Sequence, residues 1–222
     1  VGPHQLGVAV GDISGKGISA ALLMATVHAF VRAYTLVESV PALQAVGAGN
    51  GNGGNALIRM SGPENASELP PGTLLAMLNH QLYRSTPSEK YATMFLGFYD
   101  VHTRQLKYSN AGHLPPLVIG EDGSIRQLET GGLVVGLFGD VTYSDDSVEM
   151  NPGDILVAYS DGITEPENEF GEFGEERLIA LVHENRHLPL DRISEVVVSA
   201  VTDWIGGNEQ PDDVTLVLAR AQ

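Results

Sequence analysis

The feature that most constrains the fold is a glycine-rich stretch, residues 11–17, which reads Gly-Asp-Ile-Ser-Gly-Lys-Gly. A short apolar run, Leu6 to Val10, precedes it, and an amphipathic run from Ile18 to about Tyr34 follows it. This order predicts a strand, a tight turn and a helix. The turn would hold the carboxylate of Asp12 at the tip of the strand. An acid in that place is suited to bind a ligand or a metal and not to fill a core.

Length and composition restrict the class of protein. The chain has 222 residues, 43% of them apolar, so one compact domain over residues 1–222 is expected. A formal charge of −16 would repel a phosphate backbone, so nucleic acid is not expected as a partner. No apolar segment approaches the roughly 20 residues needed to span a bilayer. The absence of cysteine removes disulfides and thiolate sites and fits a cytoplasmic protein.

Helical patterns stand near the start of the chain, with an irregular segment between them. Apolar residues at spacings of three and four predict a stripe along the first helix, formed by Ala20, Leu23, Val27, Phe30 and Tyr34. A second helix is predicted over 73–86, with Thr73 as its cap. Residues 39–72 lose this periodicity and are rich in glycine and asparagine, so they are expected to form a flexible insertion.

Strand patterns dominate the middle of the chain. We expect strands over residues 93–101, 105–110, 117–119, 125–128, 147–150, 155–159 and 214–218. Further helices are expected over 175–184 and from about Asp191, the second with Trp204 in the core. Because strands cluster centrally and helices lie at both ends, the pattern predicts an α+β domain. A sheet buried on both faces, with helices outside, would give an α/β/β/α sandwich.

Acidic motifs are expected at the ends of three strands. Asp12 follows the first strand, Asp161 follows the strand over 155–159, and Asp212 with Asp213 precedes the last strand. If these strands are neighbours, the carboxylates converge and repel one another unless cations bridge them. Oxygen ligands favour Mg²⁺ or Mn²⁺. Two such ions about 3.5–4 Å apart can activate a water toward a phosphorus atom. Each motif alone is usually a simple turn, so the prediction depends on all three together.

The glycine turn with Lys16 also suggests phosphate binding through backbone N–H groups. A nucleotide-binding P-loop is disfavoured, because that pattern needs glycine where Val10 stands and serine or threonine where Gly17 stands. Lys16 is therefore either a residue that positions the turn or a weak substrate contact. His113 could be an acid group or a group that contacts a metal ligand, although a histidine in such a motif is more often a satisfied structural residue.

The chain resembles the catalytic domain of bacterial PPM-type serine phosphatases. These are relatives of protein phosphatase 2C, of the stage II sporulation protein E and sigma-factor regulation type. The matching motifs follow one another through nearly the whole chain. They are 11–17 with Ala20-Ala21-Leu22, then Ala92-Thr93-Met94-Phe95, Asn110-Ala111-Gly112-His113-Leu114-Pro115-Pro116, Gly153-Asp154, Ser160-Asp161-Gly162-Ile163-Thr164-Glu165, Phe173-Gly174 and Asp212-Asp213-Val214-Thr215-Leu216.

The resemblance implies two mainly antiparallel sheets flanked by helices and a site for two Mn²⁺ or Mg²⁺ ions. It places Asp12 between both ions and the backbone carbonyl of Ile13 on one of them. It also makes Asp161 and either Asp212 or Asp213 further ligands, with Asp212 preferred because relatives often have asparagine at the place of Asp213. Asp12, Asp161 and Asp212 would then be catalytic. The candidate substrate contacts are Ser14, Gly15 and Lys16.

The resemblance further implies hydrolysis of phosphoserine or phosphothreonine on a regulatory protein, expected to be an anti-sigma-factor antagonist. It also implies an upstream sensor or regulatory domain in the full-length protein. Engagement of that domain would shift the helices at 18–36 and 73–86 and so complete the metal site. The oligomeric state is open, with a homodimer as one alternative.

Two departures from the family pattern lead to a second hypothesis. The family carries a further metal-site acid on a strand before Asp12. Because this chain begins at Val1, we expect the first strand or strands to be missing, and metal binding to be weaker. Ser14 stands where protein phosphatase 2C has a histidine acid, so a different proton source is expected. The alternative to an active enzyme is a weak or inactive phosphatase-like module that binds a regulatory partner.

Overall fold

The chain folds into two compact units. The computed structural model describes residues 4–35, 45–49, 69–87, 89–206 and 212–222. Unit 1 takes its described residues from 1–42, 53–115 and 128–150, and unit 2 takes them from 43–52, 116–127 and 151–222. None of the helices in these described ranges is long and apolar enough to cross a membrane.

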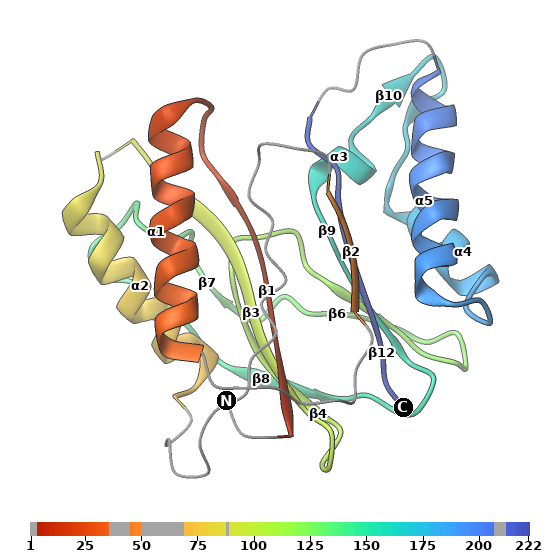
Figure 1. Cartoon of the computed structure of the whole chain (residues 1–222), viewed down its shortest axis with the longest axis horizontal. Coiled ribbons are helices and arrows are strands. Elements are labelled where there is room, and N and C mark those ends of the chain that lie inside the picture. The colour runs from red at the N-terminus through yellow and green to blue at the C-terminus, as the bar shows by residue number, and fades with distance from the viewer. Residues whose placement is uncertain (1–3, 36–44, 50–68, 88, 207–211) are drawn as a thin grey trace. The chain divides into compact units, whose positions relative to one another are not determined.

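Unit 1 is a sheet with helices on one face (Figure 1). Its elements are β1 (Gln5–Ile13), α1 (Ile18–Thr35), α2 (Pro71–Ser85), β3 (Ala92–Asp100), β4 (Gln105–Ala111), β7 (Gly131–Gly132) and β8 (Asp146–Glu149). The strand order is β1-β3-β4-β7, and β8 also pairs with β4. All of these pairs are antiparallel except β4 with β7.

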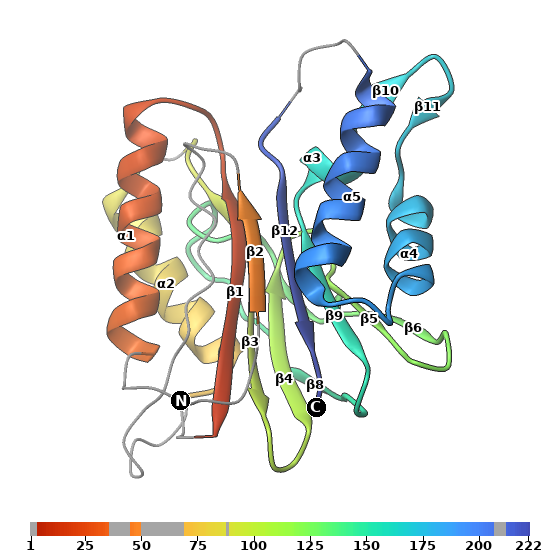
Figure 2. The ribbon, with the colours of Figure 1, turned by 45° about the vertical axis from the view of Figure 1, so that its right-hand side comes forward.

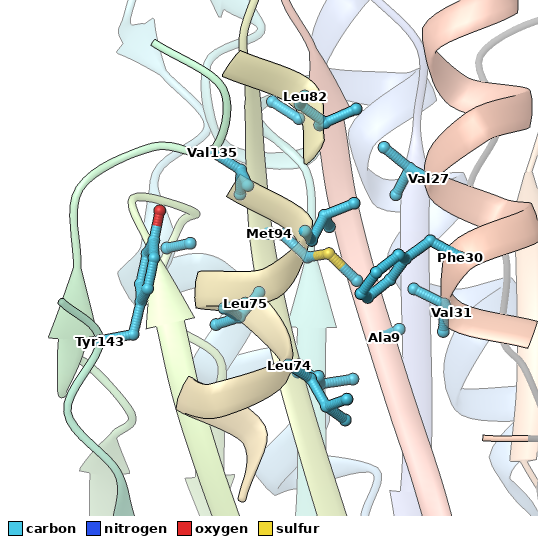
Figure 3. Packing of buried hydrophobic residues seen from close by; sticks show 14 of the residues in the cluster. Ala9, Val27, Phe30, Val31, Leu74, Leu75, Leu82, Met94, Val135 and Tyr143 are labelled. Atoms are coloured by element: carbon cyan, nitrogen blue, oxygen red, sulfur yellow. The ribbon is translucent and has the colours of Figure 1, made fainter. Parts of the chain in front are cut away.

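The core of unit 1 lies between the two helices and the sheet (Figure 3). Leu23, Val27 and Phe30 are buried on one side of α1, because residues three and four apart share a helix face. The predicted stripe is confirmed for these three, and Ala20 packs beside them partly buried. The side chain of Tyr34 lies outside the described residues. From α2 the core takes Leu74, Leu75, Leu78 and Leu82.

Unit 2 is a second antiparallel sheet, and its two longer helices lie over one face of it (Figure 2). The strand order is β2-β12-β9-β5-β6. Its elements are β2 (Ala45–Gly49), β5 (Leu117–Ile119), β6 (Ile125–Gln127), β9 (Ile155–Tyr159), α3 (Asp161–Thr164), β10 (Glu167–Asn168), β11 (Gly171–Glu172), α4 (Glu175–Glu184), α5 (Leu190–Ile205) and β12 (Thr215–Arg220). All five residues of β9 are buried, as the continuous apolar run predicts.

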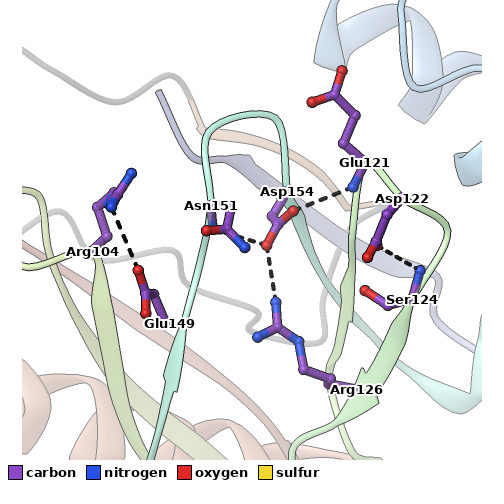
Figure 4. Close-up of polar contacts among 8 residues, drawn as sticks. All are labelled: Arg104, Glu121, Asp122, Ser124, Arg126, Glu149, Asn151 and Asp154. Carbon is purple, nitrogen blue, oxygen red and sulfur yellow. Dashed lines mark hydrogen bonds and ion pairs between the residues drawn. The ribbon is translucent and has the colours of Figure 1, made fainter.

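A buried carboxylate in unit 2 ties the turn before β9 to the β5–β6 hairpin (Figure 4). The side chain of Asp154 is 3% exposed, and one of its oxygens accepts from Arg126 Nη2 at 2.9 Å. It also accepts the backbone N–H groups of Asn151 at 2.9 Å and Glu121 at 3.3 Å. Three donors compensate the carboxylate for the water that it loses on burial.

The first strand is longer than the sequence pattern predicts. β1 continues to Ile13, so Asp12 pairs with Thr93 of β3 inside the sheet. The expectation that the turn itself holds Asp12 is therefore wrong. The pairing of β1 with β3 continues beyond the apolar run that ends at Val10 and includes Asp12 and Ile13. A Cβ at position 11 would lie 2.4 Å from the carbonyl oxygen of Thr93, so the close approach of the strands requires Gly11.

Other details of the sequence interpretation also change. The helix α2 begins at Pro71 with Pro70 before it, so Thr73 is not its cap. Trp204 is half-buried and therefore not a core residue as predicted. Its Nε1 donates to the carbonyl of Gly171 at 3.2 Å. Of the predicted insertion at 39–72, residues 45–49 pair with β12 as β2, and 39–44 and 50–68 lie outside the described residues.

Candidate functional site

In unit 1, Asp12 is an exposed acid near the end of β1. Its backbone N–H donates to the hydroxyl of Thr93 at 3.2 Å. The next residue, Ile13, pairs with Ala92 and has a buried side chain. Because pairing with β3 fixes the backbone at Asp12 and at the residues before and after it, the Asp12 carboxylate leaves the sheet from a rigid support.

The turn after β1 is held by the residues that precede β3. The N–H of Ser14 donates to the carbonyl of Tyr91 at 2.9 Å, and the hydroxyl of Ser14 accepts the N–H of Tyr91 at 2.9 Å. Lys90 Nζ donates to the carbonyl of Ser14 at 3.2 Å. The glycines at 15 and 17 adopt positive φ angles of 85° and 90°. Lys16 is exposed between them.

In unit 2, Asp161 is half-buried and begins α3, directly after β9. Its Oδ1 accepts the N–H of Gly162 at 2.8 Å. Ser160 donates its hydroxyl to the carbonyl of Asp213 at 3.0 Å and accepts the N–H of Thr215 at 2.9 Å. A Cβ at position 162 would lie 2.3 Å from the carbonyl oxygen of Asp213. Ser160 and Gly162 therefore bring the segments of two predicted ligands together.

The residues Asp212 and Asp213 are both exposed before β12. Asp212 Oδ1 accepts the N–H of Asp213 at 2.9 Å, and the carbonyl of Asp213 is the one that Ser160 contacts. The two acids thus differ in their backbone roles, while both carboxylates belong to the same turn. The preference for Asp212 as the ligand stays a prediction.

The end of β9 is anchored to α4 next to Asp161. The hydroxyl of Tyr159 donates to Glu175, and Gln127 Nε2 donates to the same carboxylate at 2.8 Å. Burial raises the pKa of Tyr159 above its ordinary value, and the bond to Glu175 raises that pKa further. Tyr159 is therefore a neutral donor that fixes the strand end from which Asp161 projects.

Two residues of the candidate site were given no role from the sequence, although Thr93 stands in one of the matching motifs. Thr93 contacts the backbone of Asp12, and its Oγ1 lies 3.0 Å from His113 Nδ1. Lys90 contacts the carbonyl of Ser14. Threonine and lysine are common in strands and turns, so neither stands out by its type. The signal that would identify Thr93 is the register of β3 against β1, and Lys90 lies just before β3.

The donor set fits a hard divalent cation, because Asp12, Asp161, Asp212 and Asp213 offer only oxygen atoms. Asp12 belongs to unit 1 and the other three acids belong to unit 2. Among the residues that the structure describes, no three histidine or acidic side chains form a group that could hold a metal ion. The metal ligands therefore stay predictions that rest on donor chemistry.

A small cavity of about 40 Å³ lies within unit 1. Its walls are mostly apolar and come from α1, β1 and β3, with His28 and Thr93 among the polar exceptions. Gly11 and Ile13 line it as well, so it borders the backbone that carries Asp12. At about 10–15 Å³ for each water molecule, a space of this size holds about three waters.

Comparison with known proteins places the chain among phosphatases. The family model for stage II sporulation protein E (SpoIIE) matches residues 2–222. The chain is 27% identical to protein IcfG from Synechocystis sp., over 98% of this chain and 34% of IcfG. It is 25% identical to phosphoserine phosphatase RsbU from Bacillus subtilis, over 98% of this chain and 56% of RsbU. The chain thus spans about a third of one relative and little more than half of the other.

Solved structures confirm the predicted fold class of mainly antiparallel sheets with flanking helices. The RsbU and RsbW domains of Rv1364c from Mycobacterium tuberculosis match with a TM-score of 0.72 and 22% identity, over 99% of this chain and 52% of that one. RsbX in complex with magnesium matches with a TM-score of 0.62 and 14% identity, over 99% and 82%. Because the family model covers nearly every residue, the chain belongs to the stage II sporulation protein E (SpoIIE) family of PP2C-like phosphatase domains.

Proposed function

We propose that the chain is a metal-dependent phosphatase that removes phosphate from phosphoserine or phosphothreonine on a regulatory protein. Its family supports this, as does its similarity to RsbU, which is a phosphoserine phosphatase. The observation that carries the proposal is the contact of Gly162 and Ser160 with the backbone of Asp213, which joins two acidic motifs at strand ends in unit 2.

The proposed ligands of two Mn²⁺ or Mg²⁺ ions are Asp12, the carbonyl of Ile13, Asp161 and Asp212, with Asp213 as the alternative to Asp212. Oxygen-only donors support this choice of metals. RsbX, a structural relative, was solved in complex with magnesium. When bound, such ions would lower the pKa of a water near the phosphorus atom and offset the charge of the phosphoryl oxygens.

The turn after β1 is the proposed contact for the phosphate of the substrate, through Ser14, Gly15 and Lys16. Lys16 is exposed, and Lys90 places a second cation at the carbonyl of Ser14. Two cations beside one turn would offset part of the charge of −16 where a phosphate has to approach. The Ser14 hydroxyl accepts the N–H of Tyr91 and so positions the turn. We do not assign proton donation to Ser14, because a neutral serine hydroxyl is a poor general acid.

The proposed substrate is an anti-sigma-factor antagonist in the bacterial cytoplasm, and an upstream domain is proposed to regulate the activity. In Rv1364c an RsbU domain occurs with an RsbW domain. The match covers 56% of RsbU, so RsbU has further sequence outside the part that resembles this chain. We propose that the upstream domain acts by shifting α1 and α2. Equal rates with and without the upstream region would contradict this regulation.

The test is Mn²⁺-dependent hydrolysis of a phosphoserine peptide by the chain and by the full-length protein. Asp161→Asn should lower the rate by about a hundredfold or more, because a ligand charge worth several kcal/mol in the transition state is lost. Asp191→Asn is the matched control, since Asp191 is exposed on α5 and its loss removes the same charge.

An unchanged rate for Asp161→Asn would contradict the assignment of this residue. Absence of turnover in both forms of the unaltered protein, with Mn²⁺ bound, would favour the alternative of an inactive module that binds a regulatory partner. Mn²⁺ binding and peptide binding are therefore measured alongside turnover.

A further inference from the structure

The motif Asn110-Ala111-Gly112-His113 has no part in the proposed metal and substrate contacts, yet it leads back to Asp12. His113 is 7% exposed, and its Nδ1 lies 3.0 Å from Thr93 Oγ1. The same oxygen accepts the backbone N–H of Asp12 at 3.2 Å. A continuous series of polar contacts thus runs from the end of β4 across β3 to the backbone of the predicted bridging ligand.

The imidazole of His113 is held on a rigid support. Asn110 is 3% exposed, and its Oδ1 accepts the N–H of His113 at 2.8 Å. Its Nδ2 donates to the carbonyl of His113 at 3.0 Å and to that of Leu128 at 3.2 Å. Gly112 between them has a φ of 69°, a conformation that favours glycine. Asn110 therefore fixes both backbone polar groups of His113, and the side chain leaves from a backbone that is held in place.

A hydroxyl is suited to the middle of this series. Thr93 Oγ1 has one proton and two acceptor positions, so it can accept the N–H of Asp12 while it bonds to His113 Nδ1. Valine has nearly the same shape as threonine but neither function. Thr93→Val would therefore remove a hydroxyl that accepts the N–H of Asp12, without opening a large cavity.

We propose that Thr93 and His113 are positioning residues that hold the backbone of Asp12 in the orientation required for metal binding. The proposal rests on the proposed function in one respect, the role of Asp12 as a ligand. A ligand that is already ordered loses little conformational freedom when the metal binds. Residues that orient metal ligands typically change metal affinity by about 10- to 100-fold when they are replaced.

The first test measures Mn²⁺ affinity by titration calorimetry on the full-length protein. Thr93→Val and His113→Gln should weaken binding by about tenfold or more. Thr93→Ser keeps the hydroxyl, and His113→Asn can place a polar atom near the position of Nδ1, so both should stay close to the unaltered protein. The longer side chain in His113→Gln places its amide near the position of Nε2, so it does not replace the contact of Nδ1 with Thr93.

The matched control is Ser109→Ala. Ser109 is buried in β4 and donates its hydroxyl to the carbonyl of Ser144 at 2.9 Å. The substitution removes a comparable bond from the same sheet but does not touch the series that ends at Asp12. Mn²⁺ affinity should therefore be unchanged. An equal loss in Ser109→Ala and Thr93→Val would overturn the proposal, because both effects would then be general losses of stability.

The second test needs neither metal nor turnover. Hydrogen exchange of the Asp12 amide in the metal-free protein should become faster by about tenfold in Thr93→Val, and not in Ser109→Ala. Unaltered protein that binds no Mn²⁺ would overturn the proposed function and with it the role in metal binding. Mn²⁺ binding and Asp12 exchange that Thr93→Val and His113→Gln leave unchanged would overturn the positioning role alone.

Discussion

At the scale of single residues, surroundings decide what an acid can do in a chain this acidic. Asp154 is buried and meets three donors, so its charge is satisfied within unit 2. Asp12 is exposed at the end of a paired strand. A buried carboxylate that meets its donors is costly to disrupt, whereas an exposed carboxylate on a paired strand is suited to recruit a cation.

Replacing Asp154 by asparagine should therefore destabilise unit 2. The amide keeps the shape but leaves Arg126 and two backbone N–H groups without their anionic acceptor, at a cost of about 3 kcal/mol. The urea midpoint can be followed by the fluorescence of Trp204, the single tryptophan, which lies on α5 in the same unit.

The control for Asp154→Asn is Glu195→Gln. Glu195 pairs with Arg192 at 2.5 Å on the surface of α5, and both side chains are more than 60% exposed. Its replacement should cost less than about 1 kcal/mol, because water screens an exposed pair. Similar shifts of the urea midpoint in both variants would show that the Asp154 network is not the anchor of this turn.

At the scale of elements, periodicity identifies helices and buried strands but not their partners. The predicted bounds of β9 and α4 agree with the structure at both ends, 155–159 and 175–184. A continuous apolar run and a helical period are local signals, so one segment suffices to recognise them. The pairing of Asp12 with Thr93 joins strands about 80 residues apart in sequence. No local pattern encodes that register, and for this reason the roles of Thr93 and Lys90 could not be predicted.

The contribution of α2 to unit 1 can be measured with a leucine pair. Leu78 on α2 is 1% exposed and Leu22 on α1 is 65% exposed. Leu78→Ala should cost about 2–5 kcal/mol, because it removes buried apolar surface and leaves a cavity. Hydrogen exchange of the β1 and β3 amides would report this loss.

Leu22→Ala is the control on a solvent-facing site, and its effect should stay within about 0.5 kcal/mol. If Leu78→Ala left the exchange of β1 and β3 unchanged, α2 would not support the sheet that carries Asp12. The proposal that a shift of α1 and α2 regulates the site would then lose its structural basis.

At the scale of the whole molecule, the predicted metal ligands come from both units: Asp12 belongs to unit 1, and Asp161, Asp212 and Asp213 belong to unit 2. Motif order in the sequence predicts Asp12, Asp161 and Asp212 as ligands, and the structure adds that Ser160 and Gly162, on either side of Asp161, contact the backbone of Asp213. The fold class could be predicted because the family motifs extend over nearly the whole chain. The hydrogen-bonded supports of the acids could not, since Ser160, Thr93 and Asn110 act through distant segments.

The charge of −16 should make catalysis depend on salt in a direction set by the substrate. Raising NaCl from about 0.01 M to about 0.1 M shortens the screening length from about 30 Å to about 10 Å. With saturating Mn²⁺, the KM for an acidic phosphoserine peptide should fall by about twofold or more, because repulsion is screened. The KM for a basic phosphoserine peptide should rise. Parallel changes for both peptides would contradict a long-range effect of the net charge.

The absent side chain at position 11 has a consequence for how the sheet assembles. Only glycine fits against the carbonyl of Thr93, where a Cβ would lie 2.4 Å from the oxygen. Sliding β1 along β3 by one residue would bring Val10 or Asp12 to this place, and each carries a Cβ that the gap does not admit. The same slip would send every side chain of the strand to the opposite face. Gly11 therefore disfavours the two neighbouring registers of β1 on β3. It lies one residue before Asp12, so the register that it favours also sets the face of the sheet from which the Asp12 side chain projects.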